Sequence, residues 1–251
     1  MVSKKHPRVT RTANFFANMF KYFAGVPKAR HLEISAIISI DDDPYKPTDE
    51  LIELSIDAVK CAHKCDLTDI IQRLNGKKNY INVFPGEHYK LLAGFVQVLN
   101  PKCVIEVGTE RGISALCLKK YMQKDAKLVT FDIIPWDKMP DCCLDKSDFN
   151  AEFVQYTDDL STPEGVNKHK ELINNADLFF IDAAKDSEFE YKLMEQFYKV
   201  GIKDNAILIF DDIRVWNMLE FWREIRMPKL DLTSFGHFSG TGVVQWKNIK
   251  I

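Results

Sequence analysis

The amino-acid sequence predicts an α/β fold: a doubly wound, mostly parallel sheet of seven strands with an antiparallel C-terminal hairpin and an N-terminal helical extension. Three observations predict it. Short runs of β-branched and aromatic residues alternate with helical patterns from Cys103 onward. A glycine-rich turn follows the first of these runs. The last two runs are joined through Ser239-Gly240-Thr241, which is typical of a hairpin.

Five buried runs account for the parallel strands, and we expect them at Cys103–Val107, Lys127–Asp132, Glu152–Tyr156, Leu178–Ile181 and Ala206–Phe210. The hairpin strands are expected at Leu230–Phe238 and Gly242–Trp246. Helical patterns cover Ile113–Gln123, Pro163–Asn174, Ser187–Val200 and Val215–Ile225. Ser161 and Glu164 have the spacing of a capping box for the second of these helices.

Two further helices are predicted before the first strand. Thr48, followed by the acidic residues Asp49 and Glu50, indicates a helix that runs to about Lys64. A second pattern covers His88–Leu99. We therefore expect residues 1–80 to form an N-terminal segment with a helical extension, and residues 81–251 to form the main domain.

The first 31 residues are basic and rich in aromatic side chains, and they contain no Asp or Glu. Such a segment suits peripheral contact with an anionic membrane surface. It equally suits a helix that packs on its own domain or on a dimer mate, and this interpretation is favoured because basic amphipathic segments are common. We therefore expect a homodimer.

Composition excludes several classes of function. The net charge of -2 and the pI of about 6.3 do not predict a nucleic-acid partner. No apolar run reaches the roughly 18 residues of a membrane span, and Lys21 interrupts the nearest candidate for a signal peptide. None of the six cysteines forms a C-x-x-C pair, so neither disulfides nor a cysteine-based zinc site is predicted. We expect a cytoplasmic protein with reduced thiols.

The sharpest motif is the segment Val104-Ile105-Glu106-Val107-Gly108-Thr109-Glu110-Arg111-Gly112-Ile113-Ser114. A buried strand enters a tight turn, and a helix begins directly afterwards. Asp132, 20 residues after Gly112, ends the next strand, where a carboxylate can accept both ribose hydroxyls of a nucleoside. The spacing E-x-G-x-x-x-G differs from the G-x-G-x-x-G of dinucleotide sites. It favours a nucleoside that carries an amino acid over a pyrophosphate.

This segment resembles motif I of the class I methyltransferases, which use S-adenosylmethionine (SAM) and have a Rossmann-like fold. From Phe84 to about Trp216 the order of features is similar to the metal-dependent O-methyltransferases of the catechol and caffeoyl-CoA type, and the overall similarity suggests a bacterial branch. The resemblance implies that Glu106 and Gly108 face the methionine part of SAM. The residues that it assigns to the cofactor are Glu87, His88, Glu106, Gly108, Thr109, Gly112, Ser114, Asp132 at the ribose, Thr157 and Asp158 at the adenine, and Asp182.

Acidic residues end two predicted strands, Asp182 after one and the pair Asp211-Asp212 after the next. Carboxyl ends of parallel strands line the ligand crevice, so the three carboxylates are expected to converge. Three clustered oxygens suit Mg²⁺ or another divalent cation, although Asp is also a common helix cap. The resemblance implies that Asp182 is a metal ligand and that Lys185, in D-x-x-K, is the base. The family has Asn where this chain has Asp212, a change that keeps an oxygen but adds charge.

The predicted reaction moves a methyl group onto a hydroxyl of a small-molecule or glycan-like acceptor. His237 is the alternative base if no metal binds. The segment 133–150, together with Arg214, Trp216 and the hairpin, is expected to recognise the acceptor. A nicotinamide-dependent oxidoreductase is the first competing function, and the glycine spacing argues against it. A non-catalytic scaffold with this fold is the second, and the retained acids and Lys185 argue against it.

Overall fold

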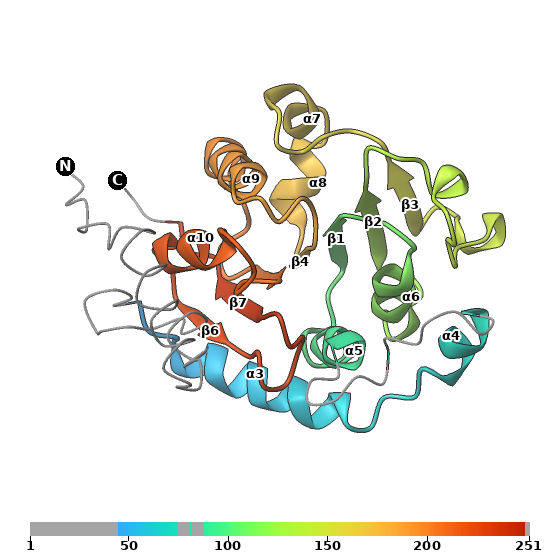
Figure 1. The fold of residues 1–251 in the computed structure, drawn as a ribbon, viewed down its shortest axis with the longest axis horizontal. Coiled ribbons are helices and arrows are strands. Elements are labelled where there is room, and N and C mark those ends of the chain that lie inside the picture. Colours follow the sequence, from blue (N-terminus) through green and yellow to red (C-terminus); the bar gives the residue numbers. More distant parts are fainter. Residues whose placement is uncertain (1–44, 75–80, 82–87, 249–251) are drawn as a thin grey trace, which may run out of the picture. The chain divides into compact units, whose positions relative to one another are not determined.

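A seven-stranded sheet in the order β3-β2-β1-β4-β5-β7-β6 lies at the centre of the described part of the chain (Figure 1). The computed structural model describes residues 45–74, 81 and 88–248. Its parallel strands are β1 (Cys103–Val107), β2 (Lys127–Phe131), β3 (Phe153–Tyr156), β4 (Leu178–Ile181) and β5 (Ile207–Asp211). The last two strands, β6 (Lys229–Asp231) and β7 (Thr241–Gln245), are antiparallel. The predicted fold class is confirmed. The predictions for residues 1–31 and for Glu87 lie outside the described residues.

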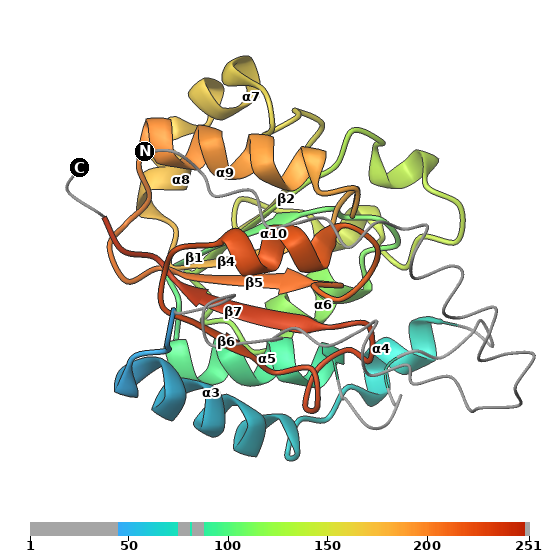
Figure 2. The same ribbon diagram turned by 60° about the vertical axis from the view of Figure 1, so that its left-hand side comes forward.

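Helices cover both faces of the sheet (Figure 2). One face carries α3 (Asp49–Ala62), α4 (Thr68–Arg73), α5 (His88–Leu99) and α6 (Ile113–Lys120). The other carries α7 (Pro163–Lys168), α8 (Lys170–Asn175), α9 (Glu188–Val200) and α10 (Met218–Glu224). Alternate residues of β1 enter the two cores, Val104 one and Ile105 the other, as the two-residue period of a strand requires.

Helix α3 shares the core of the sheet through its contact with α5. Its buried Leu51 and Ala58 belong to the same hydrophobic cluster as Phe95 of α5. A Cβ atom at Gly94 would lie 2.2 Å from the carbonyl oxygen of Ala58, so only glycine permits this close approach of the two helices. None of the helices that the structure describes is long and apolar enough to cross a membrane.

The helix predicted over Pro163–Asn174 is two helices, α7 and α8, which meet at His169. The predicted capping box is wrong by one residue, because Thr162 is the N-cap and its hydroxyl accepts a hydrogen bond from Gly165 N at 3.1 Å. Helix α4 was not predicted. Two short 3₁₀ helices, Trp136–Lys138 and Lys146–Asp148, lie within the segment after β2.

The first hairpin strand is much shorter than predicted. It ends at Asp231, and residues 232–240 form turns and loop in place of a strand. Asp231 Oδ1 accepts a hydrogen bond from Thr233 N at 2.9 Å, and its Oδ2 accepts one from Arg214 Nη2 at 2.7 Å. These side-chain bonds compete with the strand ladder and turn the chain away from it. The resulting loop carries His237 to the carboxyl end of β5.

Candidate active site

The turn after β1 is held by close packing within the protein. Gly108 has a φ of 99°, and a Cβ atom there would lie 1.9 Å from the carbonyl oxygen of Asp182. Gly112, with a φ of 77°, would place a Cβ atom 2.3 Å from Leu144 Cγ. Both glycines are therefore required by their neighbours in the fold as well as by the left-handed backbone. The sequence suggested that these glycines let the backbone approach a ligand. It did not predict that neighbouring residues leave no room for a Cβ atom at either position.

A chain of side-chain hydrogen bonds connects this turn to the neighbouring strands β2 and β3. Glu106 is fully buried, and its Oε2 accepts a hydrogen bond from Thr130 Oγ1 at 2.6 Å. Thr130 Oγ1 lies 2.6 Å from Thr109 Oγ1, which also accepts a bond from Gln155 Nε2 at 3.0 Å. Glu106 Oε1 has no hydrogen-bond partner among the described residues. One acid at the end of β1 thus supports the glycine turn and keeps an oxygen for another group.

Asp132 and Asp158 are also engaged with the protein. Asp132 accepts hydrogen bonds from Glu110 N and Ile134 N, each at 2.9 Å, and so braces the turn after β1 against β2. Asp158 accepts bonds from Lys168 Nζ at 2.9 Å and lies 2.8 Å from His169 Nε2. Lys168 and His169 lower the pKa of Asp158.

The three carboxylates that end β4 and β5 converge. Ile181 and Phe210 are paired in the parallel ladder, so the next residues, Asp182 and Asp211, lie side by side. One oxygen each of Asp182, Asp211 and Asp212 lies within 4.8 Å of the others. Burial and the charge of Asp211 raise the pKa of Asp182 to about 7. Three acids at such short range are a site for positive charge.

Lys185 supplies part of that charge. Its Nζ lies 3.0 Å from Asp182 Oδ1 and also pairs with Asp212 Oδ2. Burial lowers the pKa of this lysine, but the carboxylates of Asp182 and Asp212 outweigh burial and raise it above its usual value. Both Lys185 and Asp212 have positive φ, 60° and 56°. Asp and Asn tolerate this left-handed region better than most residues, which fits the Asn of the resembling family at position 212.

His237 faces the same acids from the loop between β6 and β7. Its Nδ1 lies 3.2 Å from both oxygens of Asp211 and 3.4 Å from Asp212 Oδ1. Burial lowers the pKa of His237, but the two acids raise it to about 10. The imidazole therefore holds its proton at neutral pH, and it can act as a base only after that proton has left.

Residues 61–219 match the model of the O-methyltransferase family. The chain belongs to this family. A Dictyostelium discoideum protein named probable caffeoyl-CoA O-methyltransferase 3 is 24% identical over 190 residues, which are 72% of this chain and 71% of that protein. The family is one of class I SAM-dependent enzymes, so the family predicted from the sequence is confirmed.

Solved structures show the same fold at low identity. A Staphylococcus aureus structure, described provisionally as a caffeoyl-CoA O-methyltransferase, has a TM-score of 0.53 and 14% identity and covers 83% of this chain and 100% of its own. A methyltransferase from Geobacter sulfurreducens has a TM-score of 0.52 and 14% identity, and it covers 74% of this chain and 90% of its own.

Within this O-methyltransferase the predicted site residues fall into two groups. Along β1 and β2, the turn after β1 gathers Glu106, Gly108, Thr109, Gly112, Ser114 and Asp132. At the ends of β4 and β5 lie Asp182, Lys185, Asp211, Asp212 and His237. The carbonyl of Asp182 against Gly108 joins the groups. Thr157 lines a surface pocket with Trp136, whereas the Asp158 carboxylate is bound to Lys168.

Three contacts of the site were not predicted from the sequence. His88, expected to line the cofactor, lies with its Nδ1 3.7 Å from Asp211 Oδ1. Ser239 Oγ lies 2.9 Å from His237 Nδ1 and donates a hydrogen bond to Asp212. Buried Glu190 accepts a bond from Lys185 N at 3.0 Å and so holds that turn. A serine in a turn and a glutamate in a helix are ordinary residues, so the sequence carried no signal for the last two.

Glu106 of this methyltransferase should make folding depend on pH. Burial raises its pKa to about 8, and the hydroxyls of Ser114 and Thr130 offset part of the shift. The unfolded chain loses this proton near pH 4.5, so between pH 4.5 and 8 the folded state binds more protons and stability falls as pH rises. Glutamine has no proton to lose, so the stability of Glu106→Gln should not fall in this way. We expect the unfolding free energy of the variant, minus that of wild type, to rise by about 2 kcal/mol from pH 5.5 to pH 7.5. Urea denaturation of both proteins at both pH values measures this difference. The same difference in unfolding free energy at pH 5.5 and pH 7.5 would contradict the prediction.

Proposed function

We propose that this protein transfers a methyl group from SAM to a hydroxyl oxygen of a small-molecule or glycan-like acceptor, assisted by a divalent cation. The observation that carries the proposal is the meeting of Asp182, Asp211 and Asp212 within 4.8 Å, directly beside the turn after β1. Family membership supplies the reaction class. The acids and Lys185 are the groups that such a reaction needs at the acceptor oxygen.

The turn after β1 fits the cofactor. Glu106 Oε1 is a buried acceptor without a partner among the described residues, as the ammonium group of an amino acid requires. Asp132 uses one hydrogen bond at each oxygen, which leaves lone pairs for the ribose hydroxyls. Thr157, in the pocket beside Trp136, is the candidate for the adenine. His88 and Asp182 would border the methionine end.

The three carboxylates fit a cation, because like charges at this range are stabilised when a positive charge joins them. A divalent cation supplies Lewis acidity that lowers the pKa of an acceptor hydroxyl. Lys185 lies where the proton of that hydroxyl would go, since its Nζ borders Asp182 and Asp212. Asp182 and Asp212 keep Lys185 protonated, so Lys185 can accept a proton from the acceptor only after it has lost the proton that it already carries. The three acids therefore determine both the binding of the cation and the protonation of Lys185.

Large apolar side chains are exposed at the same edge of the sheet. Ile133 follows β2, Trp216 follows β5 with 79% of its surface exposed, and Phe235 and Phe238 lie in the loop before β7. The aromatic rings of Trp216, Phe235 and Phe238 favour an acceptor with an aromatic ring or a sugar face. Arg214, which is expected to contact the acceptor, is paired with Asp231.

Methyl transfer is tested by incubating the full chain with SAM, a divalent cation and a panel of catechols, phenols and sugars. Mass spectrometry then identifies methylated products and S-adenosylhomocysteine. A parallel calorimetric titration compares SAM with NADH and NADPH. Binding of a nicotinamide and not of SAM would favour the oxidoreductase. SAM binding without any product over a broad panel would favour the scaffold.

Asp132→Ala should weaken SAM binding by about 1–3 kcal/mol, because the change removes charge-assisted hydrogen bonds to the ribose. Loss of the bonds to Glu110 N and Ile134 N would add to the effect. Isothermal titration calorimetry with the folded variant measures it. Asp137→Ala, in the exposed turn that follows, is the matched control and should leave the affinity unchanged. Equal affinities of the Asp132 variant and wild type would refute the ribose assignment.

A further inference from the structure

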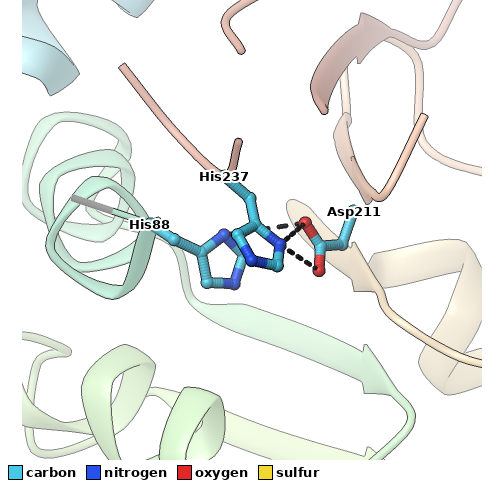
Figure 3. Close-up of side chains that lie close together, drawn as sticks. All are labelled: His88, Asp211 and His237. Atoms are coloured by element: carbon cyan, nitrogen blue, oxygen red, sulfur yellow. Dashed lines mark hydrogen bonds and ion pairs between the residues drawn. The ribbon is translucent and has the colours of Figure 1, made fainter. Parts of the chain in front are cut away.

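Two histidines and one aspartate meet at the end of β5 (Figure 3). His88 is the first residue of α5, Asp211 is the last residue of β5, and His237 comes from the loop between β6 and β7. One ring nitrogen of each histidine and one oxygen of Asp211 lie within 4.8 Å of one another. The side chains come from three separate elements, and all three point toward a common centre.

His88 provides the second, independent observation. Only 7% of its surface is exposed, and its Nδ1 has no hydrogen-bond partner among the described residues. The atom lies 3.7 Å from Asp211 Oδ1, which is too far for a hydrogen bond. Buried polar atoms are almost always satisfied, so an unpaired nitrogen aimed at a buried carboxylate indicates a missing ligand.

The distances fit two atoms bound to one metal ion. Ligand atoms at about 2.1 Å from a metal are separated by about 3.0 Å at right angles and about 4.2 Å when opposite. The distances from Asp211 Oδ1 to His237 Nδ1 and His88 Nδ1, 3.2 and 3.7 Å, fall inside this range. Aromatic contacts hold the His88 ring, with centroids 4.8 Å from Tyr89 and 5.1 Å from His237. The three ligand side chains are therefore already in place, and a metal ion that binds them would displace the proton that His237 holds.

We propose that His88, Asp211 and His237 bind a first-row transition-metal ion of the Zn²⁺ class, in a 2-His-1-carboxylate arrangement. Imidazole nitrogen suits Zn²⁺, Co²⁺ and Fe²⁺, whereas Mg²⁺ takes oxygen ligands almost exclusively. Asp211 is shared with the three acids, so this ion would lie beside Lys185. The inference deepens the proposed function and rests on it only for the role of the ion in catalysis.

The position of Lys185 distinguishes this site from a site formed by the three carboxylates alone. Its Nζ pairs with Asp182 and Asp212, whereas the ion pairs of Asp211 among the described residues are with His88 and His237. An ion held by the two histidines and Asp211 therefore enters without displacing the ammonium group. Asp182→Asn should accordingly leave Zn²⁺ affinity within about threefold of wild type, and this separates the two ligand sets.

The test uses the full chain, stripped of metal and free of SAM and acceptor. Zn²⁺ is titrated by calorimetry, and Co²⁺ binding is followed by visible absorption. We expect one tight Zn²⁺ site that a hundredfold excess of Mg²⁺ does not empty. His88→Gln and His237→Gln should each weaken Zn²⁺ binding at least tenfold and change the Co²⁺ ligand-field bands. The matched control is His63→Gln, because His63 is an exposed histidine that follows α3. This change should alter neither the Zn²⁺ affinity nor the Co²⁺ bands.

Three results would overturn the proposal. Unchanged Zn²⁺ affinity in both histidine variants would exclude these ligands, and loss of binding in Asp182→Asn would assign the ion to the acids. A thiolate charge-transfer band of Co²⁺ as the main signal would place the ion at the free cysteines. Circular dichroism verifies that each variant is folded. If a histidine change unfolds the chain, Asp211→Asn is a further variant that should lose Zn²⁺ binding. None of these readouts needs methyl transfer, so failure of the proposed function leaves them intact.

Discussion

Removal of divalent cations with EDTA should abolish methyl transfer and leave SAM affinity unchanged. Asp182, Asp211 and Asp212 lie within 4.8 Å of one another, and their mutual repulsion favours a bound cation. SAM is expected to bind at the turn after β1, through groups other than Asp211 and Asp212. Product formation with and without EDTA, followed by mass spectrometry, measures the first effect, and calorimetry measures the second.

Asp211→Ala should reproduce the effect of EDTA, because Asp211 belongs to both possible ligand sets. Asp211→Asn keeps the shape of this buried side chain and guards against unfolding. EDTA saturated beforehand with the same cation is the control and should not inhibit. Full activity in EDTA would refute the role of the metal and leave His237 as the remaining candidate base. His237 would then have to act from a pKa of about 10.

Lys185→Ala should lower turnover by roughly 10²–10⁴ with the metal still bound, as expected for loss of a general base. Its Nζ forms ion pairs with both Asp182 and Asp212. Turnover is measured at saturating SAM and acceptor, and metal content is measured on the same sample. The two readings separate a base from a residue that only balances the charge of the acids.

Lys185→Arg makes this distinction sharper. Arginine keeps the positive charge between Asp182 and Asp212 but does not give up its proton in proteins. If Lys185 is the base, the arginine variant is as slow as the alanine variant. If Arg restores more than about a tenth of wild-type turnover, the role of Lys185 is electrostatic and the assignment of the base is wrong.

Much of the sheet could be predicted because buried strands differ from their flanks in composition. The bounds of β1 and β4 agree with the sequence prediction residue for residue, since each is a largely apolar run that is followed by a glycine or an aspartate. The convergence of Asp182 and Asp211 followed from the same pattern, because neighbouring parallel strands end at one edge. Local composition therefore determined the positions of these strands along the chain and the place of the acids.

The parts that failed depend on contacts between distant residues. The chain leaves the ladder after Asp231, whose carboxylate binds Arg214 and Thr233, and α7 ends where His169 contacts Asp158. Neither partner can be inferred from local periodicity. Side-chain hydrogen bonds of this kind compete with regular backbone structure on nearly equal terms, so tertiary context decides the outcome.

The sequence by itself determined the fold class, the glycine turn with Glu106 and Asp132, and the acids with Lys185, because each is a local pattern with a known place in a parallel sheet. Only the tertiary structure decided that His88 and His237 share Asp211. These residues come from a helix, a strand end and a loop, and no spacing along the chain encodes their distance in space. The charge states follow from the same cause, since the pKa of His237 depends on acids that the fold alone brings to it.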